Sequence, residues 1–219
     1  MIPPVIMPCL FCCAMASAMK TRLAGGHVTG AVVLGIVCGF LPGLVHRALM
    51  GEPAAAIFAM HPVVLAVVAG AVAGSLAGAV VAHNLADRVF FWVESLALGL
   101  TACVFADISF KPLMWDNPCT PALVALFAGL FCTLAPGFVR DVALGDTAAF
   151  VDESWHATAA ALGIMFTLAL RHLFPDMPTP LIEGVASNAR PLAFYAPPLV
   201  GTLLVIVLRW RRHGAGLQS

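Results

Sequence analysis

The residues best suited to act on an ion are two polar pairs, each of which follows a Pro-Gly dipeptide inside an apolar segment. His46-Arg47 follows Pro42-Gly43, and Arg140-Asp141 follows Pro136-Gly137. Ionisable groups at membrane depth cost about 2.5–3.5 kcal/mol on insertion scales, so they usually face a cavity or a partner. These pairs could therefore line a pore mouth. The alternative is that they are interfacial anchors whose charged ends reach water.

The prolines of these dipeptides also affect the backbone of the preceding turn. Proline has no N–H, so Pro42 leaves the carbonyl of Cys38 without its helical donor, and Pro136 does the same to the carbonyl of Cys132. In hydrocarbon such a carbonyl must face protein, water or an ion. Two freed carbonyls near the membrane midplane could coordinate a cation, with Thr133 as a polar neighbour. The alternative is a pair of kinks that only shape packing.

A single acidic residue interrupts a third apolar segment. Asp107 lies in Val104–Phe110, and Lys111 follows one helical turn later, in the register of an ion pair. The pair could be purely structural. An Asp107 carboxylate that faced a cavity would instead attract cations and repel anions.

The composition identifies the class of protein in which these residues lie. Of 219 residues 61% are apolar and only 10% are charged, against about 45–50% and about 25% in soluble domains. The sequence therefore predicts an integral membrane protein. Eleven basic and eleven acidic residues cancel, and no basic block is large enough for nucleic acid. No cysteine and histidine spacing is typical of a metal site, and no compact set of carboxylates and histidines indicates an enzyme, so we expect neither catalysis nor a cofactor.

Seven apolar windows near the ~20 residues that a bilayer requires predict seven transmembrane helices and no strands. The expected helices are 4–20, 27–49, 61–83, 90–110, 119–144, 154–173 and 194–210. With the N-terminus outside, seven basic residues of the connections lie inside and four outside. This bias predicts an external N-terminus and a cytoplasmic C-terminus.

An internal repeat organises these helices. Shifting the chain by 94 positions aligns Pro42-Gly43 with Pro136-Gly137 and Cys38 with Cys132, and it also aligns Cys9 with Cys103. Each repeat then holds three helices, and an odd number of crossings inverts the second repeat in the membrane. Inverted repeats are a common construction of transporters and related pores. We expect a first repeat at 1–86, an inverted second repeat at 87–175, and a region at 176–219 with a loop, a seventh helix and a basic tail. The second helix of each repeat should be broken at its Pro-Gly dipeptide.

The residues around the two dipeptides carry a family resemblance. Ala135-Pro136-Gly137-Phe138-Val139-Arg140-Asp141 with the preceding Gly129, and the echo Leu41-Pro42-Gly43-Leu44-Val45-His46-Arg47, resemble the bacterial trimeric intracellular cation (TRIC) channels. They are also similar to the duplicated three-helix domain described as glycine-transporter-like. The family usually has a glycine triplet and an Arg-Asp pair in each half. Here both triplets contain proline, and only Arg140-Asp141 is intact.

The resemblance implies a seven-helix homotrimer in a bacterial-type inner membrane, with one pore in each protomer at its second and fifth helices. It implies conduction of monovalent cations, chiefly potassium. The alternative function is a secondary transporter of a small solute such as glycine, which would use the same inverted repeats. The candidate ion pathway consists of Cys38, Pro42, Gly43, His46, Arg47, Asp107, Lys111, Cys132, Thr133, Pro136, Gly137, Arg140 and Asp141.

Overall fold

The computed structural model describes residues 5–81, 83–110, 119–146, 154–174 and 196–216, and within them all regular secondary structure is helical. The helices are α1 (Ile6–Leu23), α2 (Val28–Leu49), the short 3₁₀ helix η1 (Ala54–Ala59), α3 (His61–Val80), α4 (His83–Ser109), α5 (Thr120–Leu144), α7 (Ser154–Leu173) and α8 (Ala196–Gly216). Each of the seven expected helices overlaps one of the seven α-helices.

Five of these helices are long and apolar enough to cross a membrane. They are α1, α2, α3, α5 and the Asp87–Ser109 part of α4. Because α7 and α8 are not among these candidate spans, the seven membrane crossings stay a prediction. The all-helical, multi-pass membrane class is confirmed.

The expected breaks at the two Pro-Gly dipeptides are not found. Pro42 lies inside α2 and Pro136 inside α5, and each helix runs without interruption through its proline. A proline removes one donor and crowds the preceding turn, but the remaining hydrogen bonds on both sides still hold the helix together. The prediction of two interrupted helices is therefore not confirmed, since the loss of one hydrogen bond does not by itself end a helix.

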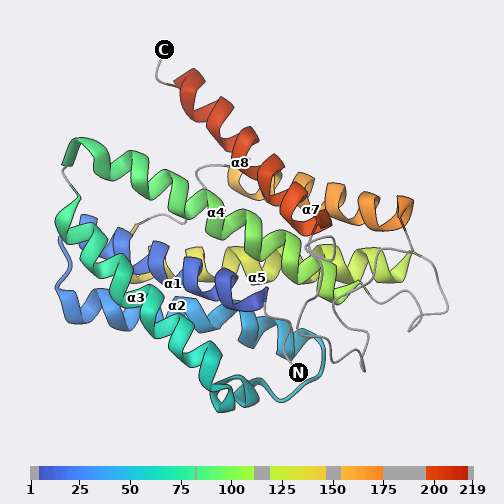
Figure 1. Cartoon of the computed structure of the whole chain (residues 1–219), viewed down its shortest axis with the longest axis horizontal. Helices are drawn as coiled ribbons and strands as arrows, with labels where there is room; N and C mark the ends of the chain where they lie inside the picture. The colour runs from blue at the N-terminus through green and yellow to red at the C-terminus, as the bar shows by residue number, and fades with distance from the viewer. Residues whose placement is uncertain (1–4, 82, 111–118, 147–153, 175–195, 217–219) are drawn as a thin grey trace.

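The bundle is centred on α1 and α4. Helix α1 packs against α2, α3 and α4, whereas α4 also packs against α5, α7 and α8. Helices α2 and α5 contact each other across the bundle. Figure 1 shows α1, α2, α4 and α5 running alongside one another, while the C-terminal end of α8 projects beyond them. Side chains from α1, α4, α5, α7 and α8 can therefore meet inside the bundle.

Glycines set the closest helix contact, between α1 and α3. A Cβ atom at Gly74 would overlap the carbonyl oxygen of Met15, and one at Gly70 would overlap the carbonyl oxygen of Phe11. The backbones can therefore approach only because these positions lack side chains, as in other small-residue contacts of membrane helices.

We expect Gly74→Ala to lower the apparent unfolding temperature in detergent strongly, because backbone atoms of α1 cannot turn aside as a side chain can. The matched control is Gly30→Ala in α2, where a Cβ would meet no atom within 4 Å. That control should be neutral or slightly stabilising, because alanine is the better helix former. Equal unfolding temperatures for the two variants would contradict the close contact.

Glycine contacts also show how α1 corresponds to α4. A Cβ at Gly35 of α2 would lie 2.9 Å from both the Ala14 carbonyl oxygen and the Ala18 Cβ, and a Cβ at Gly129 of α5 would meet the same atoms of Ala102 and Ala106. Ala14 and Ala18 lie 88 positions before Ala102 and Ala106, whereas Gly35 lies 94 before Gly129. The sequence matches within α1 and α4, such as Cys9 with Cys103, are therefore not structural equivalents. The division into repeats at 1–86 and 87–175 stays a prediction.

Candidate functional site

A cavity of about 50 Å³ lies inside the bundle between α1, α4, α5 and α7. This volume is enough for ordered water beside polar groups. The lining residues are Cys13, Ala16, Ser17, Glu94, Ala97, Leu98, Thr133, Leu134, Pro136, Gly137, Phe138, Arg140, Asp141 and His156. Three of them carry a formal charge, in a part of the chain where apolar side chains dominate, so the cavity is the candidate functional site.

Helix α5 supplies the polar wall that the sequence predicted. Thr133, Pro136, Gly137, Arg140 and Asp141 all line the cavity, because positions three and four apart lie on one face of a helix. The Thr133 hydroxyl is buried and has no hydrogen-bond partner in the structure. One turn below Pro136, the carbonyl of Cys132 lacks its usual helical donor, because proline has no N–H. Of these two oxygen atoms, only the Thr133 hydroxyl belongs to a residue that lines the cavity, where it is left for water or an ion.

The Arg140-Asp141 pair is held by a lysine from α1. Arg140 Nε donates to Asp141 Oδ1 at 2.7 Å, and Lys20 Nζ donates to the same oxygen at 2.8 Å. Lys20 Nζ also lies 3.5 Å from Asp146 Oδ2 at the exposed end of α5. Asp141 is 1% exposed, whereas the side chain of Asp146 is 52% exposed. Lys20 thus lies between a buried and an exposed carboxylate.

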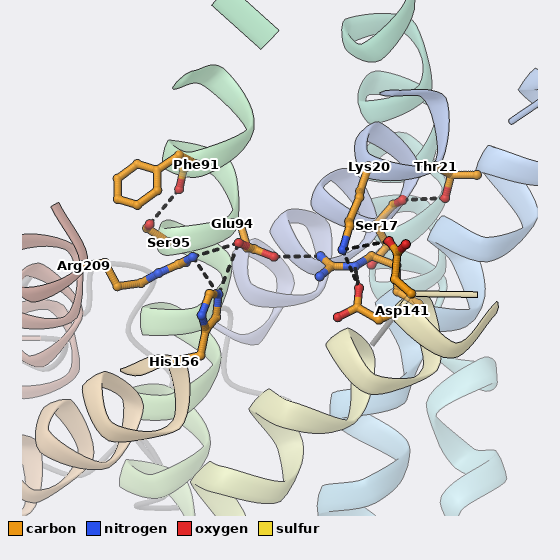
Figure 2. A network of polar contacts seen from close by, with 11 residues as sticks. Ser17, Lys20, Thr21, Phe91, Glu94, Ser95, Asp141, His156 and Arg209 are labelled. Atoms are coloured by element: carbon orange, nitrogen blue, oxygen red, sulfur yellow. Dashed lines mark hydrogen bonds and ion pairs between the residues drawn. The ribbon is translucent and has the colours of Figure 1, made fainter. Parts of the chain in front are cut away.

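Glu94 of α4 joins this cluster to α7 and α8. Arg140 Nη1 lies 2.9 Å from Glu94 Oε1, and Arg209 Nη2 donates to Glu94 Oε2 at 2.8 Å. Arg209 Nη2 also lies 2.7 Å from His156 Nε2, which in turn lies 3.4 Å from Glu94 Oε2. Figure 2 shows Arg209, His156 and Glu94 converging from three helices. Charges of opposite sign therefore alternate from Asp146 through Lys20, Asp141, Arg140 and Glu94 to Arg209, a set that we call the charge network.

The two arginines of the charge network also contact aromatic rings of α4. The guanidinium carbon of Arg140 lies 5.7 Å from the centre of the Phe90 ring, and that of Arg209 lies 5.2 Å from the centre of the Phe91 ring. Both distances are within the range of cation–π attraction. Both arginine side chains are buried, so they and their carboxylate partners lie in a medium of low dielectric. Removing one of these carboxylates would therefore lower the stability of the folded protein strongly.

The expected pathway residues of α2 lie elsewhere. None of the described residues of α2 lines this cavity. His46 Nε2 lies 3.1 Å from Ser109 Oγ, and its ring packs on Phe105 with the centroids 5.2 Å apart. Arg47 lies 3.4 Å from Glu52 near the surface. Cys38, Pro42 and Gly43 are buried, Gly43 in close contact with Ile57 of η1. A pathway that includes α2 stays a prediction.

Asp107 has a different partner from the one that the local spacing suggested. Its Oδ2 accepts a hydrogen bond from Arg171 Nη2 of α7 at 2.8 Å, and Arg171 Nε bonds to Oδ1, so the two groups form a buried bidentate pair. Lys111 lies outside the described residues. Asp107 does not line the cavity, and the geometry favours the structural reading of this residue. Cys132, also expected near the pathway, is fully buried.

Four residues of the charge network, Lys20, Glu94, Asp146 and Arg209, were not among the predicted site residues, and neither was His156. Lys20 and Arg209 resemble the basic anchors found at helix ends, and Glu94 and His156 lie near the expected starts of helices. One signal could have identified Glu94. It is an acidic residue in an otherwise apolar segment, within two helical turns of aromatic residues, and such a position predicts a buried partner for its charge. Among the described residues, no group of three or more potential ligands could hold a metal ion.

Comparisons with known proteins address the fold. No protein-family model matches the sequence, and no curated protein matches it at a significant level. Solved structures do. The TRIC trimeric intracellular cation channel orthologue from Rhodobacter sphaeroides superimposes with a TM-score of 0.74 at 18% identity, over 97% of this chain and 96% of that one. A prokaryotic TRIC channel crystallised in 0.5 M KCl gives 0.71 at 17% identity, over 95% of both chains.

A third structure, from work on conductance through TRIC cation channels, gives a TM-score of 0.68 at 16% identity, over 97% of this chain and 92% of that one. The similarity covers α1 to α8 and is not confined to one repeat. The resemblance inferred from the Pro-Gly segments is confirmed at the level of structure: the chain has the TRIC channel fold.

Proposed function

We propose that this chain forms a cation channel, with an ion pathway that passes through the cavity beside α5. The observation that carries the proposal is the cavity itself, where buried charges and the unpaired Thr133 hydroxyl lie together inside a bundle with the TRIC fold. A globular core of this size would normally pair or exclude such groups.

The chemistry of the α5 wall fits a monovalent cation. A weakly hydrated ion such as potassium needs several neutral oxygen ligands, which replace its water shell. The Thr133 hydroxyl can supply one of them, and Ser17 of α1 also lines the cavity. Glu94 and Asp141 provide negative charge, while Arg140 and Lys20 keep the balance close to neutral. An ion can then enter without being bound so tightly that it cannot leave.

Thr133→Val tests the role of the Thr133 hydroxyl while keeping the shape of the side chain. Valine has nearly the same volume as threonine but no hydroxyl, so we expect single-channel potassium conductance to fall several-fold while the unfolding temperature stays the same or rises. Thr133→Ser keeps the hydroxyl and should conduct close to the unsubstituted protein. Equal conductance of the valine and serine variants would show that Thr133 Oγ1 does not face the ion.

The proposal includes a homotrimer with one pathway in each protomer; the name of the Rhodobacter neighbour describes that protein as trimeric. It also includes a bacterial-type inner membrane, with the N-terminus outside and the C-terminus in the cytoplasm. Native mass spectrometry in detergent gives the number of subunits. Labelling of an introduced terminal cysteine by an impermeant reagent gives the orientation.

The deciding experiment is recording from the purified protein in planar bilayers with unequal potassium chloride on the two sides. We expect discrete current steps and a reversal potential close to that of potassium. Silence from protein that is folded and inserted would exclude a channel. Solute uptake that saturates and requires an ion gradient would then identify the alternative, a secondary transporter of a small solute such as glycine.

A further inference from the structure

The contact between Arg209 and His156 fixes the protonation state of this histidine in the observed arrangement. Arginine keeps its proton and offers only donors. Since Arg209 Nη2 lies 2.7 Å from His156 Nε2, the histidine nitrogen must accept. His156 is therefore neutral here, and its single ring proton lies on Nδ1. The same Arg209 nitrogen donates to Glu94 Oε2 at 2.8 Å, so its two hydrogen atoms serve two acceptors.

A protonated His156 is incompatible with this arrangement. Nε2–H and Nη2–H would face each other as two donors on two cations, at a distance suited to one hydrogen bond. Glu94 Oε2 already lies 3.4 Å from His156 Nε2. The protonated ring can take this oxygen as its acceptor with a small movement. Arg209 then loses His156 as an acceptor but can keep Glu94, because a carboxylate oxygen accepts two hydrogen bonds. His156 would therefore exchange Arg209 for Glu94.

The surroundings of His156 make this exchange consequential. The charged groups that face this region come from each helix packed on α7: Glu94 from α4, Arg140 and Asp141 from α5, and Arg209 from α8. Across the charge network three carboxylates and three basic groups balance, so an added proton leaves one uncompensated positive charge. His156 and Glu94 both line the cavity. Arg209, whose Nη1 is already buried without a partner, is the group that links α8 to α4.

We propose that His156 is a proton-binding site that controls the cavity: uptake of one proton breaks the contact between His156 and Arg209, turns the ring to Glu94 and adds positive charge to the cavity wall. The effect on transport rests on the proposed cation channel, because a positive charge on the wall repels the permeating ion. Proton binding and the exchange of partners do not depend on it.

The structural half is tested on the full-length protein in lipid nanodiscs with ¹⁵N-labelled histidine. His156→Gln identifies the His156 signals, and His172→Gln, an exposed position on the same helix, is the matched control. At about pH 8 we expect the neutral tautomer with the proton on Nδ1, and a charged ring as the pH falls towards about 5. A neutral ring protonated on Nε2, or a ring that stays neutral across this range, would overturn the proposal.

The functional half is tested in planar bilayers over the same pH range. We expect potassium conductance to fall about tenfold as the pH is lowered, which corresponds to about 1.4 kcal/mol. His156→Gln should lose this dependence, because its amide oxygen can accept from Arg209 but does not titrate, and His172→Gln should keep it. Unchanged pH dependence in His156→Gln would remove the role in control. If no current appears at any pH, the channel proposal fails, while the nuclear magnetic resonance result still decides the proton site.

Discussion

Replacing Glu94 by glutamine should destabilise the protein more than any other conservative change in the charge network. Glu94 is the counter-charge of both Arg140 and Arg209, at 2.9 and 2.8 Å. An amide oxygen can still accept one hydrogen bond, but both guanidinium groups lose the negative charge between them. Removing one partner of a buried ion pair costs about 3–5 kcal/mol, because the other charge stays buried.

The protein contains its own probe for this measurement. Six of its seven free cysteines are buried and only Cys119 is exposed, so a thiol-reactive fluorophore reports thermal unfolding in detergent. The matched control is Glu52→Gln, since the Glu52 side chain is 46% exposed and lies 3.4 Å from Arg47. Such surface pairs contribute about 0–1 kcal/mol. If Glu94→Gln unfolds at the same temperature as Glu52→Gln, the charge network does not hold α4 to α8.

Asp107→Asn should produce the second large loss of stability and should leave ion selectivity unchanged. The substitution leaves Arg171 buried without its bidentate partner, which again costs about 3–5 kcal/mol. Asp107 does not line the cavity, so its charge is not expected to act directly on a permeating ion. Thermal unfolding and the reversal potential in unequal potassium chloride measure the two effects separately.

A double variant distinguishes the stability lost by leaving one buried charge unpaired from the stability that the ion pair itself contributes. In Asp107→Leu combined with Arg171→Leu no buried charge remains, and apolar pairs of similar volume are often as stable as the ion pair that they replace. We expect the double variant to recover most of the stability that Asp107→Asn loses. A shift in reversal potential for Asp107→Asn, with stability preserved, would instead place this carboxylate beside the ion.

The positions of the helices were predictable from the sequence because apolar windows of membrane length leave few alternatives. The α5 part of the site was predictable for a local reason too, since Thr133, Pro136 and Arg140 recur at helical spacing and share one face. The expected pathway residues of α2 do not line the cavity, although the sequence pattern around the two Pro-Gly dipeptides is similar. The gapless alignment pairs residues of α1 and α4 at an offset of 94 positions, but the glycine contacts pair them at 88. Local sequence similarity does not reveal this difference of six positions.

Partners that are distant in sequence were beyond local reasoning. The spacing of Asp107 and Lys111 suggested a pair one helical turn apart. In the structure the Asp107 carboxylate accepts a hydrogen bond from Arg171 of α7, which lies 64 positions away in the sequence. Lys20 and Asp141 are 121 positions apart, and Glu94 and Arg209 are 115 apart. Nothing in the periodicity of one helix indicates which side chain of another will neutralise its charge.

These long separations order the events of biosynthesis. Lys20 leaves the ribosome when Asp141 has not yet been made, and Glu94 enters the membrane before Arg209 exists. A charge at the centre of a membrane helix costs about 2.5–3.5 kcal/mol on insertion scales. The first repeat therefore holds Lys20 before its buried carboxylate partner exists. A chain that stops before α8 leaves Glu94 with Arg140 but without Arg209, one of its two basic partners.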